Sequence, residues 1–242
     1  MGTLKPETRY RGWAYARGGD YHRNLNPNWS YAPTYLQKMA FVRKFIISLP
    51  RETRILDVGC GEGVLVEEFR HRGWNIQGID LNYESDYVLR GSACRIPFQD
   101  QSVGLVLFLD VLEHLAFEEQ PKALEEFYRV LSPKGYLVLS IPNLSHLNSR
   151  YLLTRRGRLD RTDSEINHVG ERPYWENVQL LTKSRFTIVR QTGITFTLPF
   201  IYRRVICKQP AKYRWLHDLL EPLARALPSF AMLNIFVCQK AA

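Results

Sequence analysis

The sequence predicts an α/β fold in which helices cover both faces of a doubly wound, mostly parallel sheet. Apolar strand segments alternate with amphipathic helical segments between Arg54 and Ile141. A glycine-rich loop, Gly59-Cys60-Gly61-Glu62-Gly63, follows the first of these strands. Acidic residues stand where three of the strands end, at the edge where open α/β sheets bind ligands. A chain of 242 residues can bury the core of one such unit.

The first elements are read from apolar spacing and from residues that end them. A helix is expected near Tyr35–Leu49, because Pro50 follows and apolar residues recur at helical spacing, namely Met39, Val42, Phe45 and Ile46. Strand Arg54–Val58 then leads through the glycines into a helix that Gly73 ends. Strand Trp74–Asp80 follows that helix.

The second half of the chain continues the alternation. Val103–Leu109 is a continuous apolar run, typical of a strand buried on both faces. Strand Tyr136–Ile141 comes after a helix with apolar side chains on one face, namely Leu124, Phe127, Tyr128 and Leu131. Two last strands are expected at Phe186–Phe196 and Ala231–Gln239. Between them, leucines at helical spacing around Pro222 predict a kinked helix or two short ones.

The glycine loop and the acid that follows it indicate a nucleotide-like cofactor. Glycines let the backbone approach a ligand closely, and Asp80, about 20 residues later, is placed to bind both ribose hydroxyls. Two departures from the dinucleotide pattern refine this interpretation. Val64 occupies the position of that pattern's third glycine, and Asp57 beside the loop would repel a pyrophosphate but attract an ammonium or sulfonium group. We therefore expect a partly cationic ligand with an adenosine and no phosphate.

With these residues the sequence resembles the class I S-adenosylmethionine-dependent methyltransferases, in particular their small-molecule branch. The resemblance extends through Arg95–Asp100, Asp110–Leu115 and Leu131–Leu137, and covers roughly residues 50–142. It implies a Rossmann-like, seven-stranded sheet whose last strand is antiparallel. It also implies S-adenosylmethionine as the cofactor.

The resemblance assigns residues to parts of the cofactor. Main chain at Gly59, Cys60 and Gly61 would contact the methionine part, and Asp57 would interact with its amino group directly or through water. Asp80 would hold the ribose hydroxyls. The adenine would contact three further residues, namely Leu81, Ser92 and Ala93. Similar enzymes carry an acid where this chain has Ser92, so the adenine amine would meet a weaker acceptor here.

The turn after Leu109 is expected to face the methyl group. Asp110 is a further cofactor-binding candidate, or alternatively a carboxylate that orders the loop. His114 is the first candidate for a general base and His168 the second, because imidazole titrates near neutral pH. Ordering of the turn by Glu113 and His114 is the structural alternative. Asp110, Glu113 and His114 also have the spacing of a divalent-metal site found in a subset of similar O-methyltransferases, but Asp110 stands where that subset has Glu, and no metal is expected.

The domain organisation predicted for the chain is one catalytic domain, residues 51–242, with insertions near 143–172 and 197–230. Residues 1–50 form an arm and a helix that would cap the substrate. The arm contains six aromatic residues that either pin it to the core or form a lid, namely Tyr10, Trp13, Tyr15, Tyr21, Trp29 and Tyr31.

Composition limits the partners and the compartment. The net charge is +9, with basic clusters at Arg150–Arg161 and Arg203–Arg214. These clusters would face nucleic acid, anionic lipid or an acidic substrate, or are simply solvated. No long apolar run or signal peptide is recognised, and the four cysteines lack metal or disulfide spacing. A cytoplasmic protein is expected, with peripheral membrane contact as an option.

The function predicted from the sequence is methyl transfer from S-adenosylmethionine to a small-molecule or lipid-like acceptor. Two alternatives stay open. The basic composition favours an RNA methyltransferase, although no RNA-binding module is recognisable. A non-catalytic cofactor-binding or interaction protein is also compatible with the fold. The sequence names neither the acceptor nor the oligomeric state.

Overall fold

The computed structural model describes residues 25–160 and 168–240 and contains one seven-stranded sheet. The strand order is β3-β2-β1-β4-β5-β7-β6. Strand β7 runs antiparallel to β5 and β6, and the remaining neighbours are parallel. The predicted fold class is therefore confirmed. The strands are β1 (Ile55–Val58), β2 (Ile76–Asp80), β3 (Val88–Arg90), β4 (Val103–Leu109), β5 (Leu131–Pro142), β6 (Phe186–Phe196) and β7 (Ala231–Lys240).

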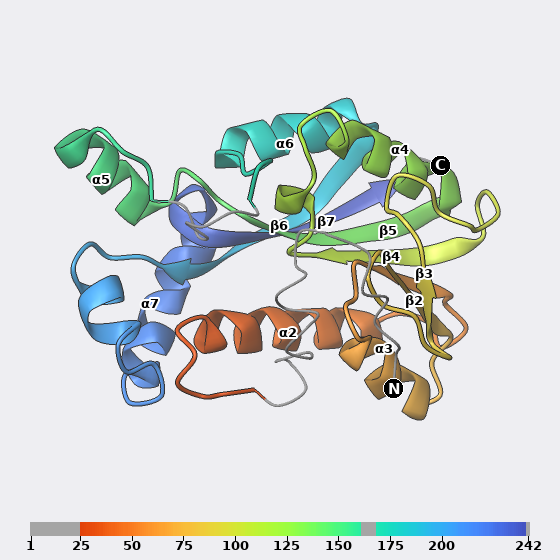
Figure 1. The fold of residues 1–242 in the computed structure, drawn as a ribbon, viewed down its shortest axis with the longest axis horizontal. Helices are drawn as coiled ribbons and strands as arrows, with labels where there is room; N and C mark the ends of the chain where they lie inside the picture. The colour runs from red at the N-terminus through yellow and green to blue at the C-terminus, as the bar shows by residue number, and fades with distance from the viewer. Residues whose placement is uncertain (1–24, 161–167, 241–242) are drawn as a thin grey trace.

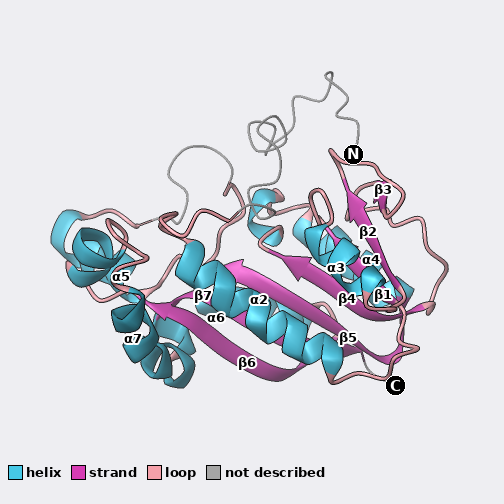
Figure 2. Ribbon diagram, turned by 90° about the horizontal axis from the view of Figure 1, so that it is seen from below, coloured by secondary structure: helices cyan, strands magenta, loops and turns pink. Residues whose placement is uncertain are grey.

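Helices lie on both faces of the sheet (Figure 1). Helices α4 and α6 cover one face, and α2 and α3 cover the other, where α2 lies over the sheet (Figure 2). Within residues 25–160 and 168–240, no helix combines the length and the apolar character needed to cross a membrane. The helices are α2 (Ala32–Ile47), α3 (Val64–His71), α4 (Gln120–Val130), α5 (Leu147–Arg156), α6 (Tyr174–Lys183) and α7 (Arg214–Ala226).

Each face of the sheet has its own apolar core. On the α4 and α6 side, Phe127 packs edge-on against Phe108 of β4, with ring centroids 4.7 Å apart, and Leu181 of α6 joins the same cluster. On the other side, Val42 of α2 and Phe69 of α3 pack on the strands. Because the central strands are covered on both faces, their sequences are almost entirely apolar.

The strand order reverses between β1 and β4. The chain passes from β1 towards β2 on one side, whereas β4 and β5 lie on the other. Open α/β sheets bind ligands at such a switch point, outside the carboxyl ends of the strands. The glycine loop after β1 and the turn after β4 both lie there.

The segment between β6 and β7 contains a short π-helix, η2 (Tyr202–Ile206), then α7, then a 3₁₀ turn, η3 (Pro228–Phe230). It forms a third apolar cluster in which Leu220 and Ala224 of α7 pack near Phe196. The sequence predicted a kinked helix or two short ones here. The structure shows a single helix with Pro222 inside it.

Candidate functional site

The glycine loop after β1 is held in a conformation that favours glycine. Gly59, Gly61 and Gly63 all have positive φ, at 73°, 58° and 77°. A Cβ built on Gly59 would lie 2.5 Å from Cγ2 of Val111, in the turn after β4. The loop therefore packs directly on the turn that carries Asp110 and His114.

Asp80 closes this loop from the end of β2. Its Oδ2 accepts a hydrogen bond from the Gly61 N–H at 2.8 Å, and its Oδ1 accepts one from the Asn82 N–H at 2.8 Å. Each carboxylate oxygen can accept a second hydrogen bond. The Asp80 carboxylate is therefore fixed against the glycine loop, at the end of β2 where the ribose hydroxyls are expected.

Asp57, within β1, is a buried carboxyl group with only 4% of its surface exposed. Burial, and then the charge of Asp80, raises the pKa of Asp57 to about 7, although Lys38 opposes this rise. A cationic group beside the glycine loop would favour the ionised form. The site is thus suited to a positively charged ligand.

Asp110 is engaged by donors from three segments. Its Oδ2 accepts hydrogen bonds from the Lys38 Nζ at 2.5 Å and the Tyr31 hydroxyl at 2.8 Å, and its Oδ1 accepts one from the Ser140 hydroxyl. Burial alone would raise the pKa of Asp110, but the ion pair with Lys38 and these hydrogen bonds bring it below its ordinary value. Asp110 also has a φ of 56°, which is uncommon for a residue other than glycine.

Lys38 was not singled out from the sequence. It is 4% exposed and lies on the face of α2 that also carries Tyr35 and Val42. A lysine at helical spacing among apolar residues was the available signal, because a buried ammonium needs a carboxylate partner. Its partner lies 72 residues away in the sequence.

Part of the predicted arm lies in this region. Trp29 and Tyr31 pack on the α2 side of the core, with ring centroids 5.2 Å apart. This contact agrees with the interpretation that arm aromatics pin the chain to the core. The other four aromatic residues of the arm lie outside the described residues.

The residues predicted to meet adenine lie around the ends of β2 and β3. Leu81 follows Asp80, and the Gly91 N–H donates to the Asp80 carbonyl at 2.9 Å, so the turn containing Ser92 and Ala93 lies beside β2. The Ser92 hydroxyl oxygen accepts a hydrogen bond from the Cys94 N–H at 3.2 Å. All three predicted adenine contacts are half-buried, and their roles stay predictions.

Cys60 turns its side chain away from the open side of the loop. A Cβ built on Gly78 of β2 would lie 2.6 Å from the Cys60 Sγ, so only glycine leaves room for the thiol there. A ligand contact from Cys60 would therefore come from its main chain, as the sequence analysis expected.

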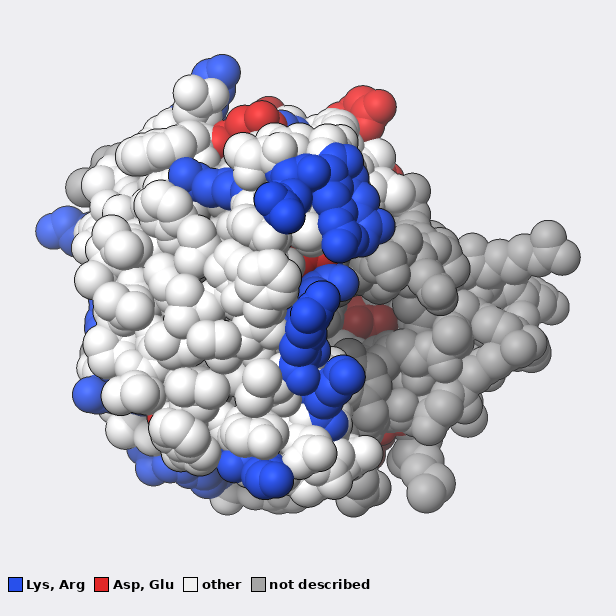
Figure 3. Space-filling model, turned by 90° about the vertical axis from the view of Figure 1, so that its left-hand side faces the viewer, with Lys and Arg blue, Asp and Glu red and all other residues white. Residues whose placement is uncertain are grey.

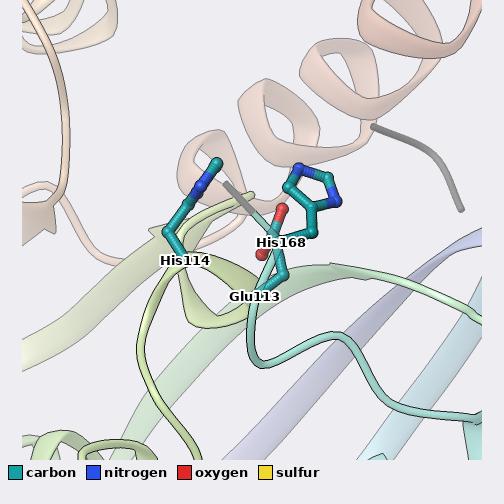
Figure 4. A group of neighbouring side chains, drawn as sticks. All are labelled: Glu113, His114 and His168. Carbon is teal, nitrogen blue, oxygen red and sulfur yellow. The ribbon is translucent and has the colours of Figure 1, made fainter. Parts of the chain in front are cut away.

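Glu113, His114 and His168 form a cluster at the turn after β4. One ligand-type atom from each lies within 4.8 Å of the others, and the two imidazole centroids are 4.8 Å apart. Figure 4 shows the Glu113 carboxylate between the two rings. Glu113 is 1% exposed, and its Oε2 has no hydrogen-bond partner among the described residues. Burial, and then the charge of Asp110, raises the pKa of Glu113 well above its ordinary value.

Main-chain contacts bring the His168 segment to this turn. The Gly170 N–H donates to the Glu113 carbonyl at 2.9 Å, and the Gln120 side chain donates to the Gly170 carbonyl at 2.8 Å and the Leu112 carbonyl at 3.0 Å. A Cβ on Gly170 would lie 2.1 Å from the Leu115 carbonyl oxygen. The approach of His168 to His114 therefore depends on Gly170 and Gln120.

The cluster suits two kinds of chemistry. Two imidazoles and a carboxylate can accept and release a proton, and the same donors fit a divalent transition metal. The metal site considered from the sequence consisted of Asp110, Glu113 and His114. In the structure the Asp110 carboxylate is paired with Lys38, and His168 lies beside Glu113 and His114 instead. The unpartnered Glu113 oxygen is compatible with either use.

Comparison with known proteins places residues 56–139 within the model of a methyltransferase domain family. Two relatives illustrate the range of activities named for similar proteins. A tRNA (carboxymethyluridine(34)-5-O)-methyltransferase of Arabidopsis thaliana is 28% identical over 124 residues, which are 46% of this chain and 29% of that protein. A ubiquinone biosynthesis O-methyltransferase of Photobacterium profundum is 26% identical over 105 residues, which are 37% of this chain and 44% of that protein. The match thus spans less than half of either relative.

The fold is shared with solved methyltransferase structures. A putative methyltransferase from a complex with the Trm112 methyltransferase activator of Haloferax volcanii superposes with a TM-score of 0.61. The two chains are 15% identical, and the alignment covers 98% of this chain and 100% of the other. At this identity the likeness shows the fold.

We expect Asp57→Asn to stabilise the protein in the absence of ligand. A folded-state pKa of about 7, against an ordinary 3.8, means that Asp57 favours folding below about pH 4 and loses that contribution as the pH rises to about 7. Urea unfolding should therefore show the variant more stable by about 3 kcal/mol near pH 8 and nearly equal to wild type near pH 4. The exposed Asp86→Asn is the matched control. A difference in unfolding free energy between Asp57→Asn and wild type that does not change with pH would contradict the raised pKa of Asp57.

Proposed function

We propose that this chain, in which residues 56–139 match a methyltransferase domain family, is an S-adenosylmethionine-dependent enzyme that methylates a small-molecule or lipid-like acceptor. The observation that carries the proposal is the contact of Gly59 with Val111, which sets the glycine loop directly beside the turn with Glu113 and His114. A cofactor on the loop would thus meet an acid–base cluster at its reactive end. When bound, S-adenosylmethionine supplies an electrophilic methyl group.

Different residues around the loop bind different parts of the cofactor. Asp80, whose carboxylate accepts hydrogen bonds from the N–H groups of Gly61 and Asn82 and so lies against the loop, binds the two ribose hydroxyls. Asp57 binds the ammonium group of the methionine part, which favours its ionised form. Asp110, paired with Lys38, shapes the pocket wall and does not itself need to contact the cofactor.

The two imidazoles handle the proton of the acceptor. His114 accepts the proton that an oxygen or nitrogen nucleophile loses as its bond to the methyl carbon forms. His168, whose Nδ1 lies 3.8 Å from the Glu171 Oε2, is placed to pass that proton onward. Proximity and orientation supply much of the acceleration in such a displacement, and the base adds to it.

An RNA acceptor is the second candidate, because one relative is named as a tRNA methyltransferase and the chain is basic. Methyl-labelled S-adenosylmethionine incubated with fractionated cell extract separates the candidates. We expect label in the small-molecule or organic-soluble fraction, and none with a variant that does not bind the cofactor. Label in RNA would replace the proposed acceptor class, and label in no fraction would favour a non-catalytic protein.

Asp80→Ala should weaken cofactor binding. Each lost charged hydrogen bond to a ribose hydroxyl costs about 1.5–3 kcal/mol, or roughly a factor of 10 to 100 in affinity. Isothermal titration with S-adenosylmethionine measures this, with the exposed Asp86→Ala as control. Because Asp80 also holds the Gly61 N–H, Asp80→Asn should be titrated beside it, since it keeps one acceptor while removing the charge. Wild-type affinity in a folded Asp80→Ala protein would refute the ribose assignment.

His114→Ala should lower turnover by about 10²–10⁴ with little change in cofactor affinity, because a base acts mainly in the transition state. The pH–rate profile should also lose its acidic limb. The exposed His71→Ala on α3 serves as control. Activity within a few fold of wild type, with an unchanged pH profile, would make His114 a structural residue.

The same assay tests whether the cluster needs a metal. We expect methyl transfer to survive exhaustive chelation, because positioning and a proton acceptor are sufficient for this displacement. Cobalt titration gives a readout that does not depend on activity. A visible cobalt spectrum that requires His114 and His168, together with activity lost on chelation, would assign the cluster to a divalent cation instead.

A further inference from the structure

Helix α7 is oriented with polar side chains towards the protein. His217 and Glu221 are 2% and 4% exposed. The His217 Nε2 lies 2.9 Å from the Thr195 hydroxyl oxygen, and a Glu221 carboxyl oxygen accepts a hydrogen bond from the Thr195 N–H at 3.3 Å. Thr195 in turn lies 2.6 Å from the Thr34 hydroxyl of α2. Hydrogen bonds to β6 and α2 thus hold the inner face of α7, beside a small apolar contact.

The outer face of the same helix is apolar. Four large side chains stand four residues apart and form a continuous stripe at helical spacing. They are Trp215, Leu219, Leu223 and Leu227, exposed to 63%, 65%, 44% and 44%. A soluble helix normally turns its apolar stripe inward, so the folding of this domain does not account for this one.

A cationic cavity lies at the same end of the molecule. It has a volume of about 270 Å³ between α5 and the segment around η2. Arg203 pairs with Asp160, whereas the other four arginines of the cavity have no carboxylate partner in the part of the chain that the structure describes. Figure 3 shows a band of Lys and Arg side chains beside a broad uncharged surface. The cavity is lined by Asn148, Tyr151, Leu152, Arg155, Arg156, Arg158, Phe200, Arg203 and Arg204.

We propose that α5, η2 and the outer face of α7 form a docking surface for membranes that contain anionic phospholipids. Arginines of the cavity bind lipid phosphates, and the α7 stripe enters the boundary between headgroups and acyl chains. The juxtaposition of the two features favours a lipid surface. A nucleic acid would use the arginines but leave Trp215 and Leu219 in water, whereas an apolar protein face would bury the arginines without partners.

Co-sedimentation with vesicles tests this without any methyl transfer, so its outcome is independent of the proposed enzyme activity. We expect binding to vesicles of phosphatidylcholine with phosphatidylglycerol, weaker binding at high salt, and none to phosphatidylcholine alone. Replacing Arg155, Arg156 and Arg204 by Gln should weaken binding about fivefold for each charge removed. The matched control replaces three exposed lysines elsewhere by Gln and should weaken vesicle binding less. These lysines are Lys44, Lys122 and Lys183.

The stripe is tested with Leu219→Gln and Leu223→Gln together. We expect this pair to weaken vesicle binding at least about tenfold, because both side chains lose their burial in the boundary region. The control pair Ile47→Gln and Val189→Gln changes side chains of similar exposure, 51% and 49%, on other elements. A vesicle-dependent blue shift of tryptophan emission should disappear in Trp215→Phe.

Any of four outcomes would overturn the proposal. The first is no binding to anionic vesicles at low salt. The second is a loss of vesicle binding in the control variants equal to that in the test variants. The third is self-association, seen by sedimentation velocity, that the α7 pair abolishes while vesicle binding is absent. In that case the stripe would be an interface between two copies of this chain. RNA binding that needs the three arginines, without vesicle binding, would likewise reassign the surface.

Discussion

The buried ion pair between Lys38 and Asp110 is the interaction on which the rest of the candidate site depends. It joins α2 to the end of β4, and Tyr31 and Ser140 donate to the same carboxylate. Lys38 is almost fully buried, so loss of either partner would leave an uncompensated charge in the interior. The pair therefore holds α2 against the end of β4, where the glycine loop meets the turn after β4.

Three carboxyl groups near this lysine respond differently to burial. Asp110 is ionised because it has the lysine as a direct partner, whereas burial raises the pKa of Asp57 to about 7 and raises the pKa of Glu113 well above its ordinary value. Neither Asp57 nor Glu113 has a cation of its own at bonding distance in the described structure. A cationic ligand beside Asp57 and a proton on Glu113 or its imidazole neighbours would complete the charge balance. These electrostatics agree with the proposed division, in which Asp57 binds a cationic ligand group and Glu113 belongs to a cluster that handles a proton.

The sequence predicted elements whose local pattern decides their structure. The bounds expected for the strands at Val103–Leu109 and Phe186–Phe196 agree with β4 and β6. Strand β5 begins earlier than expected, at Leu131, because polar residues at its start obscure the strand pattern. The three-residue edge strand β3 is too short to show a period, and α5 and α6 were not predicted.

Most of the candidate site could be predicted because its residues follow strand ends or glycines. Asp57, Asp80 and His114 needed only this local signal. The role of Lys38 could not be predicted, because its ion pair joins segments 72 residues apart. His168 was expected as a second candidate base, but the contacts of Gly170 with Glu113 and Gln120 that bring it to His114 are visible only in three dimensions.

The two segments predicted as insertions, near 143–172 and 197–230, leave the sheet at the same edge. The first insertion follows the carboxyl end of β5 and the second follows that of β6, and both strands run in the same direction on either side of β7. Both insertions therefore leave the sheet at the edge where the cofactor loop lies. The first supplies His168 to the methyl-facing cluster and α5 to the cationic cavity. An anionic surface that engages α5 and α7 would consequently face the edge of the sheet from which an acceptor must approach the methyl group.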